Sequence, residues 1–174
     1  MLWIRFDEQD RRSSAPPFCL NSSVGERVCL QDLYEKNNLV LVFMRDDGCS
    51  GCESTINAFG ERNLEYRDQQ SKVLLVFPTN VQQLNAHSLE NDGFLEGYSM
   101  ETRSRLLLDP GGDVRRAYLE LISNDLLGEA DNILFVLDAY GAPYTALIDK
   151  DFSDVEVHDE VLKWLQYINI QCPE

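Results

Sequence analysis

Two cysteines three residues apart, Cys49 and Cys52, are the feature of the sequence that most directly implies chemistry. They follow an apolar run, Leu39–Phe43, that predicts a buried β-strand. If a helix begins after this strand, residues i and i+3 share a face of its first turn, which brings their Cα atoms to the separation of about 5.5 Å that a disulfide needs. A helix N-terminus also stabilises a thiolate, so the thiol pKa falls from about 8.5 toward 7. This arrangement is typical of a thiol–disulfide exchange site.

The residues after the pair assign different roles to the two thiols. Cys52, Ile56 and Phe59 are spaced as one face of a helix that packs against a core. Cys52 is therefore expected on the buried side and Cys49 at the exposed helix end. We expect Cys49 to attack as a thiolate and Cys52 to resolve the mixed disulfide.

The acidic residues before the pair oppose this activation. Asp46 and Asp47 place negative charge beside Cys49 and should raise its pKa, while Arg45 partly offsets them. We expect Asp46, Asp47 and Gly48 to form one side of a substrate groove at the thiol.

The other three cysteines have different expected roles. Cys19 and Cys29 stand among apolar neighbours and are expected to be small buried hydrophobes. No secretory segment precedes them, so a structural disulfide is not expected. Cys172, near the end of the chain, is a candidate third thiol.

The order of apolar runs and turns predicts an α/β fold with a central mixed β-sheet flanked by helices. Residues 1–14 are expected to be a weakly packed leader, although Leu2, Ile4 and Phe6 alternate as in an edge strand; residues 15–174 form one domain. The remaining expected elements are a hairpin at 18–30, strands at 39–43, 73–77 and 106–108, a hairpin at 133–148, and helices after Cys49, at 80–87, 114–121 and 155–168. Residues 88–104 are expected to be irregular.

Charge and composition exclude several classes of function. The chain has 30 acidic and 15 basic residues and a net charge of −15, so phosphate backbones and anionic membranes are unfavourable partners. No apolar run is long enough to span a membrane, and a cytoplasmic location is expected. No cofactor is expected. A zinc site lacks a second Cys/His pair, and a copper site would need His87 or His158 beside the two cysteines.

Six patterns occur in the order found in one family. They are residues 15–20, 25–33, 39–52, 73–77, 106–118 and 134–141. The series resembles the peroxiredoxin branch of the thioredoxin-like superfamily, also called alkyl hydroperoxide reductase/thiol-specific antioxidant or redoxin. The resemblance implies a thioredoxin-like fold, with an N-terminal β-hairpin extension and the redox cysteine at a helix start.

The chain departs from this family at two functional positions. Peroxiredoxins carry a Pro-x-x-x-Thr/Ser-x-x-Cys signature. Counted back from Cys49, Val42 stands at the proline position and Asp46 at the hydroxyl position; counted from Cys52, these positions hold Arg45 and Cys49, so neither register fits. The arginine that the family places before its later strand aligns with Asn132, which could contact a substrate backbone. An ionised aspartate cannot donate a hydrogen bond to a developing oxyanion. We therefore expect slow or absent peroxide reduction.

These observations predict a thiol–disulfide oxidoreductase of the redoxin type that uses Cys49 and Cys52. The expected partner is a thioredoxin- or glutaredoxin-type dithiol donor or a disulfide-bearing protein, and a homodimer is left open. The alternative is a degenerate, non-catalytic redoxin that acts as a binding or scaffold module through its acidic surface.

Overall fold

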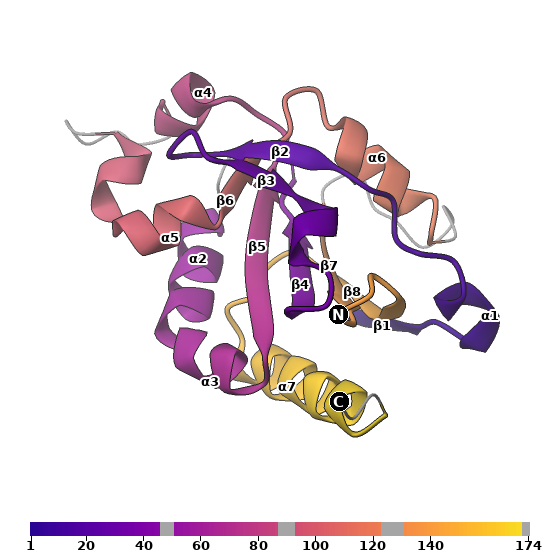
Figure 1. Ribbon diagram of the computed structural model, residues 1–174. Coiled ribbons are helices and arrows are strands. Elements are labelled where there is room, and N and C mark those ends of the chain that lie inside the picture. Colours follow the sequence, from indigo (N-terminus) through magenta and orange to yellow (C-terminus); the bar gives the residue numbers. More distant parts are fainter. Residues whose placement is uncertain (46–50, 87–92, 123–130, 172–174) are drawn as a thin grey trace.

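A single mixed β-sheet forms the centre of the molecule (Figure 1). The computed structural model describes residues 1–45, 51–86, 93–122 and 131–171. Its eight strands follow the order β1-β8-β7-β4-β5-β6-β2-β3. Their bounds are β1 Leu2–Arg5, β2 Cys19–Ser22, β3 Arg27–Cys29, β4 Asn38–Phe43, β5 Ser71–Phe77, β6 Leu106–Leu108, β7 Asn132–Leu137 and β8 Pro143–Asp149. Strands β4, β5 and β6 are parallel, and the other paired strands are antiparallel.

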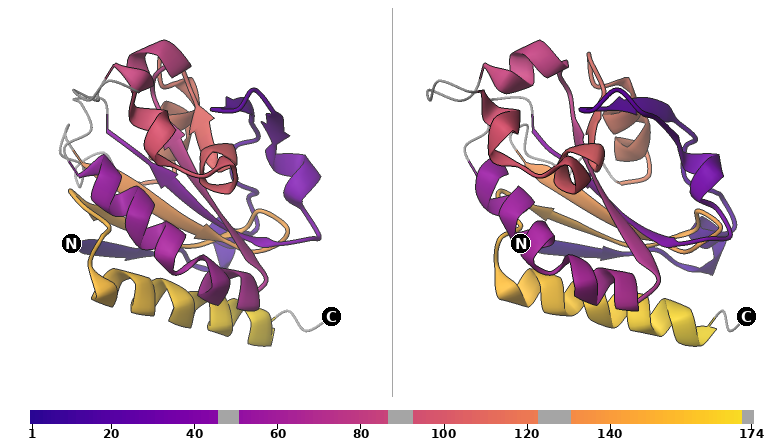
Figure 2. Two further views of the ribbon diagram at one scale, coloured as in Figure 1. Left: turned by 90° about the vertical axis from the view of Figure 1, so that its left-hand side faces the viewer. Right: turned by 60° about the vertical axis from the view of Figure 1, so that its left-hand side comes forward.

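Helices cover both faces of the sheet. One face carries α2 Cys52–Glu61, α3 Asn63–Asp68, α4 Val81–Asn85, η2 Phe94–Gly97 and α7 Val155–Gln171. The other carries η1 Leu30–Leu33 and α6 Asp113–Leu119. The short helices α1 Glu8–Arg11 and α5 Met100–Ser104 complete the described set. Figure 2 shows α2 and α7 on the same side of the sheet.

Strand β4 is buried on both faces because it lies between β5 and β7. Val40 and Val42 point into the core under α2 and α7, whereas Leu39, Leu41 and Phe43 point into the core under α6. A strand covered on both sides needs a continuous apolar sequence rather than an alternating one. This explains why the run that precedes the two cysteines is uniformly apolar.

The predicted fold class is confirmed: the sheet is mixed, helices flank it, and the β2–β3 hairpin extends it beyond β6. The expected irregular segment 88–104 is partly wrong, because η2 and α5 lie within it. Helix α3 also lies beyond the expected elements, since α2 ends at Glu61 and Arg62 joins the two helices. Each of these short helices buries at most one side chain, so none produces a clear period in the sequence.

The N-terminal segment packs more closely than a weakly packed leader would. Leu2–Arg5 pair in antiparallel register with β8, and the backbone N–H of Phe6 donates to the carbonyl of Tyr144 at 3.1 Å. The Phe6 side chain is 6% exposed and stacks on Phe135 with ring centroids 6.3 Å apart. The edge strand that the alternation of Leu2, Ile4 and Phe6 allows is therefore the observed structure.

Cys19 and Cys29 form a disulfide between β2 and β3, which corrects the expectation that both are simple buried hydrophobes. Backbone hydrogen bonds hold the hairpin on both sides of the cysteine pair. On one side Leu30 N–H donates to Phe18 O at 3.0 Å, and on the other Ser22 N–H donates to Glu26 O at 2.7 Å. The two cysteines therefore occupy a non-hydrogen-bonded pair, where Cα atoms approach most closely. Their Cα atoms lie 4.0 Å apart.

We expect this disulfide to contribute about 2–3 kcal/mol to the free energy of unfolding, because it closes a loop with a sequence separation of 10 in the unfolded chain. Urea unfolding of a Cys19→Ser/Cys29→Ser variant should show that loss. Adding dithiothreitol should lower the stability of the original chain toward the variant's value and leave the variant unchanged. Equal stability of the two proteins without reductant would contradict the prediction.

Candidate active site

The end of β4 is fixed by a side chain from the neighbouring strand. The backbone N–H of Arg45 donates to Oδ1 of Asn132 at 2.7 Å, and Nδ2 of Asn132 donates to the carbonyl of Lys150 at 2.8 Å. Asn132 is 1% exposed and is the first residue of β7. Both ends of its amide are therefore used to hold the end of β4 against the end of β8. In this arrangement Asn132 acts as a positioning residue.

After residues 46–50, the described chain continues with Gly51, and helix α2 begins at the next residue. Its N-cap, Gly51, has φ +88°, a left-handed conformation that glycine adopts without steric cost. Cys52 is the first residue of the helix and is 2% exposed. Thr55, Ile56 and Phe59 share its buried face. The expected burial of Cys52 on the core side of a helix is confirmed.

A carboxylate from a distant part of the chain lies at the first turn of α2. Asp151 Oδ1 accepts hydrogen bonds from Thr55 Oγ1 at 3.1 Å and from Ser54 Oγ at 3.4 Å. The same carboxylate accepts from the backbone N–H and the hydroxyl of Ser153, both at 2.9 Å. Its Cγ lies 3.9 Å from the position that a Cβ on Gly51 would occupy. Asp151 thus ties the start of α2 to the β8–α7 connection and places negative charge beside it.

A guanidinium lies at the end of β4. Arg115, on α6, donates to the carbonyls of Phe43 at 3.3 Å, Met44 at 3.1 Å and Asp131 at 2.8 Å. These carbonyls belong to the last residue of β4 and to the residues next to the ends of β4 and β7. The observed contacts are those of a cation held at the end of the strand that leads to Cys49.

The predicted site residues divide into two groups. Cys52 and Asn132 lie within the described structure. Cys52 begins α2, and Asn132 begins β7 and binds the backbone of Arg45 just beyond the end of β4. The others fall outside the described residues: Asp46, Asp47, Gly48, Cys49 and Cys172. Sequence reasoning missed Asp151 as a neighbour of the site. Nothing local could have identified it, because 96 residues separate it from Thr55.

No group of three or more His, Cys, Asp or Glu side chains within the described ranges is placed to hold a metal ion. His158, one of two candidate copper ligands, is buried and uses both ring nitrogens. Its Nε2 lies 2.9 Å from the carbonyl of Phe152 and its Nδ1 lies 2.7 Å from the hydroxyl of Tyr66. Because a carbonyl can only accept, Nε2 carries the proton and Nδ1 accepts from Tyr66. His87 lies outside the described residues.

No helix in the described part of the chain is long and apolar enough to cross a membrane.

A family model described as the AhpC/TSA family matches residues 12–153 of the chain. No curated protein matches it in sequence.

Solved structures of thiol enzymes share the fold. Thioredoxin peroxidase I of Plasmodium yoelii superposes with a TM-score of 0.68 at 17% identity, covering 92% of this chain and 95% of that one. Peroxiredoxin Q of Xanthomonas campestris gives 0.64 at 21% identity, with 86% and 90% covered. A protein assigned as the thiol:disulfide interchange protein DsbE of Chlorobium tepidum gives 0.61 at 17% identity, with 88% and 96% covered. At these identities the likeness establishes the fold.

Burial lowers the pKa of His158 below its usual 6.5. As the pH falls below about 6.5, His158 therefore binds a proton more readily in the unfolded chain than in the folded chain. We expect the free energy of unfolding contributed by this residue to be fully present above that pH and to decline below it. Urea unfolding between pH 5.0 and 7.5 should show a shallower slope for His158→Gln than for the original chain. A His87→Asn variant, which changes the other histidine, should keep the original slope; an unchanged slope for His158→Gln would contradict the prediction.

Proposed function

Because the chain belongs to the AhpC/TSA family of thiol oxidoreductases, we propose that Cys49 and Cys52 are its redox-active pair and exchange disulfides. The observation that carries this proposal is the position of Cys52. It is the first residue of a helix that follows the central strand and is almost completely buried. A buried thiol reacts with a partner three residues away far more readily than with a large external substrate.

The proposed reaction has three steps. The Cys49 thiolate attacks one sulfur of a substrate disulfide, which forms a mixed disulfide and releases the other sulfur as a thiolate. The Cys52 thiolate then attacks Cys49 Sγ, which releases the second substrate sulfur and leaves a Cys49–Cys52 disulfide. An external dithiol of the thioredoxin or glutaredoxin type reduces this disulfide and becomes oxidised in turn. The substrate gains two electrons, and the external dithiol supplies them.

The charges near the end of β4 and the start of α2 influence the fraction of Cys49 that is ionised to the thiolate. The helix N-terminus and the guanidinium of Arg115 favour the anion. The carboxylate of Asp151, together with the charges of Asp46 and Asp47 in the sequence, disfavours it. Such opposition should keep the pKa of Cys49 higher than the helix terminus alone would make it.

We expect Cys49→Ser to abolish turnover of a model disulfide, and Cys52→Ser to leave one turnover that stops at a mixed disulfide. Both variants are best made in a Cys19→Ser/Cys29→Ser background, so that the hairpin thiols do not enter the count. When Cys49 and Cys52 are both present in that background, oxidation should remove two thiols per chain, as measured by Ellman titration. Mass spectrometry should place the new disulfide between residues 49 and 52. Full turnover by the Cys49→Ser variant would overturn the proposed role.

Asp151→Asn should lower the pKa of Cys49, because it removes a negative charge and keeps an oxygen that can accept from Thr55. The rate of Cys49 alkylation by iodoacetamide, followed against pH, measures this pKa. Glu61→Gln is the matched control, since it removes one charge from the exposed far end of the same helix. A larger shift in Glu61→Gln than in Asp151→Asn would contradict the expectation.

Peroxide reduction by the same pair is the second candidate, and the position of Arg115 favours it. A guanidinium at the end of β4 could stabilise the negative charge that develops on a leaving oxygen. The peroxide would oxidise the Cys49 thiolate to a sulfenic acid, which Cys52 would convert to the disulfide with loss of water. Hydrogen peroxide consumption, coupled to a thioredoxin recycling system, separates this reaction from disulfide exchange.

The non-catalytic alternative is a redoxin that binds partners through its acidic surface. It differs from both reactions in one measurable property, an unreactive Cys49. A cytoplasmic location, a dithiol donor and a homodimer remain predictions of the proposed function.

A further inference from the structure

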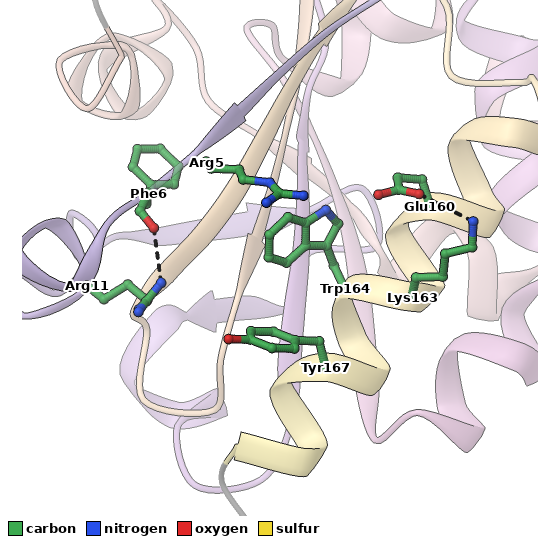
Figure 3. A pocket seen from close by; sticks show the side chains of 7 residues that line it. All are labelled: Arg5, Phe6, Arg11, Glu160, Lys163, Trp164 and Tyr167. Atoms are coloured by element: carbon green, nitrogen blue, oxygen red, sulfur yellow. Dashed lines mark hydrogen bonds and ion pairs between the residues drawn. The ribbon is translucent and has the colours of Figure 1, made fainter.

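A hollow of about 380 Å³ lies between the N-terminal segment and α7, at the edge of the sheet formed by β1. Figure 3 shows its lining: Arg5, Phe6, Arg11, Glu160, Lys163, Trp164 and Tyr167. In the sheet, β8 and β7 separate β1 from β4, which leads to the proposed redox pair. The volume falls in the lower part of the range found for small-molecule sites.

The charge of this lining is opposite in sign to that of the whole chain. Three of its residues are basic and one is acidic, whereas the chain has twice as many acidic as basic residues. The acid, Glu160, lies 3.5 Å from Lys163, so its charge is compensated locally. Among the described residues, neither Arg5 nor Arg11 forms an ion pair with a carboxylate. The hollow therefore presents two guanidiniums without an ion-pair partner among the described carboxylates, and the charge of Asp7 acts on Arg11 from a longer distance.

Both guanidiniums are held in place by groups that do not neutralise them. Nη1 of Arg11 donates to the carbonyl of Phe6 at 3.0 Å, and its guanidinium lies 4.9 Å from the ring centroid of Tyr144. The guanidinium of Arg5 lies 5.2 Å from the ring centroid of Trp164. Cation–π contacts fix a guanidinium while leaving its edge N–H groups able to bind a carboxylate or phosphate.

Aromatic rings form the wall beside these cations. Trp164 and Tyr167 lie one turn apart on α7, with centroids 5.9 Å apart at an interplanar angle of 87°. Tyr167 is 44% exposed, so much of its ring is open to a ligand. In Figure 3 its ring extends across the hollow toward Arg11. Because the two rings are nearly perpendicular, a flat ring that stacks on one of them meets the other edge-on, and both arrangements are favourable.

We propose that this hollow, the Arg5–Arg11 pocket, binds a small molecule in which a carboxylate or phosphate is joined to a flat ring. The positive charges of Arg5 and Arg11 attract the anionic group, and the ring stacks on Tyr167 or Trp164. This function is separate from thiol chemistry and does not require the proposed redox pair.

Saturation-transfer NMR titrations of the full chain test the proposal with two matched pairs of probes. Benzoate is compared with neutral benzamide, and adenosine monophosphate with neutral adenosine. We expect at least one anion to bind about tenfold more tightly than its neutral partner, as expected for a charge-assisted hydrogen bond. The ratio of affinities within each pair, charged against neutral, shows whether the carboxylate or the phosphate contributes more to binding.

Arg11→Gln should reduce the affinity for that anion about tenfold. Arg5→Gln, at an exposed position of the edge strand, should also weaken binding and provides a second test if Arg11→Gln disturbs folding. Arg27→Gln is the control, since it removes the same charge from an exposed residue of β3 at the opposite edge of the sheet.

Four results would overturn the proposal. They are equal binding of the charged and neutral probes, no binding of either ring anion, a loss in Arg27→Gln as large as in Arg11→Gln, and inorganic phosphate binding as tightly as the ring anions. In the second case, binding of a glutamate-rich peptide would assign the pocket to an acidic protein segment instead.

Discussion

The end of the central strand is the constraint on which the proposed site depends. Where β4 stops pairing with its neighbours, its backbone groups still need partners, because a buried polar group without one costs about 1–3 kcal/mol. Side chains supply them: the amide of Asn132 accepts from Arg45, and the guanidinium of Arg115 donates to the carbonyls of Phe43 and Met44. These contacts fix where the chain leaves the sheet. They therefore also fix the start of the segment that carries Cys49.

The other end of that segment is held by an independent set of contacts. Thr55 and Ser54 donate to Asp151, and the backbone N–H of Phe152 donates to Thr55 Oγ1 at 3.3 Å. Residues 46–50 therefore connect two points that are each anchored to the end of β8, through Lys150 on one side and Asp151 on the other. The same contacts place the positive charge of Arg115 at the end of β4 and the negative charge of Asp151 at the start of α2. Position and electrostatics thus have one structural origin.

The sequence predicted the parts of this arrangement that depend on local patterns. Strand β4 follows from its continuous apolar run, and the buried face of α2 and the two hairpins follow from periodicities of 3.6 and two residues. The roles of Asn132 and Asp151 could not be predicted in this way, since their partners Arg45 and Thr55 are 87 and 96 residues distant. Sequence alone suggested a substrate contact for Asn132, because nothing local shows that both ends of its amide are occupied.

The disulfide is a different case, because the sequence contained the information needed to find it. Pairing Leu20 with Val28 across the expected hairpin sets a register in which Cys19 stands directly opposite Cys29. The general rule that disulfides are rare in reducing compartments does not take this register into account. The register was the better guide to structure, since it brings the two sulfurs together whatever their oxidation state.

That register also bears on the predicted cytoplasmic location. A reducing compartment opposes disulfides in general, yet the hairpin is held by backbone hydrogen bonds on both sides of the cysteine pair. Folding therefore raises the effective concentration of one thiol at the other, which shifts the equilibrium of this pair toward the disulfide. The proposed pair Cys49–Cys52 instead has an i, i+3 spacing in the sequence, and the carboxylate of Asp151 lies at the first turn of the helix that begins with Cys52. Two cysteine pairs in one chain can thus have different redox properties because one is positioned by a β-ladder and the other by a charged helix terminus.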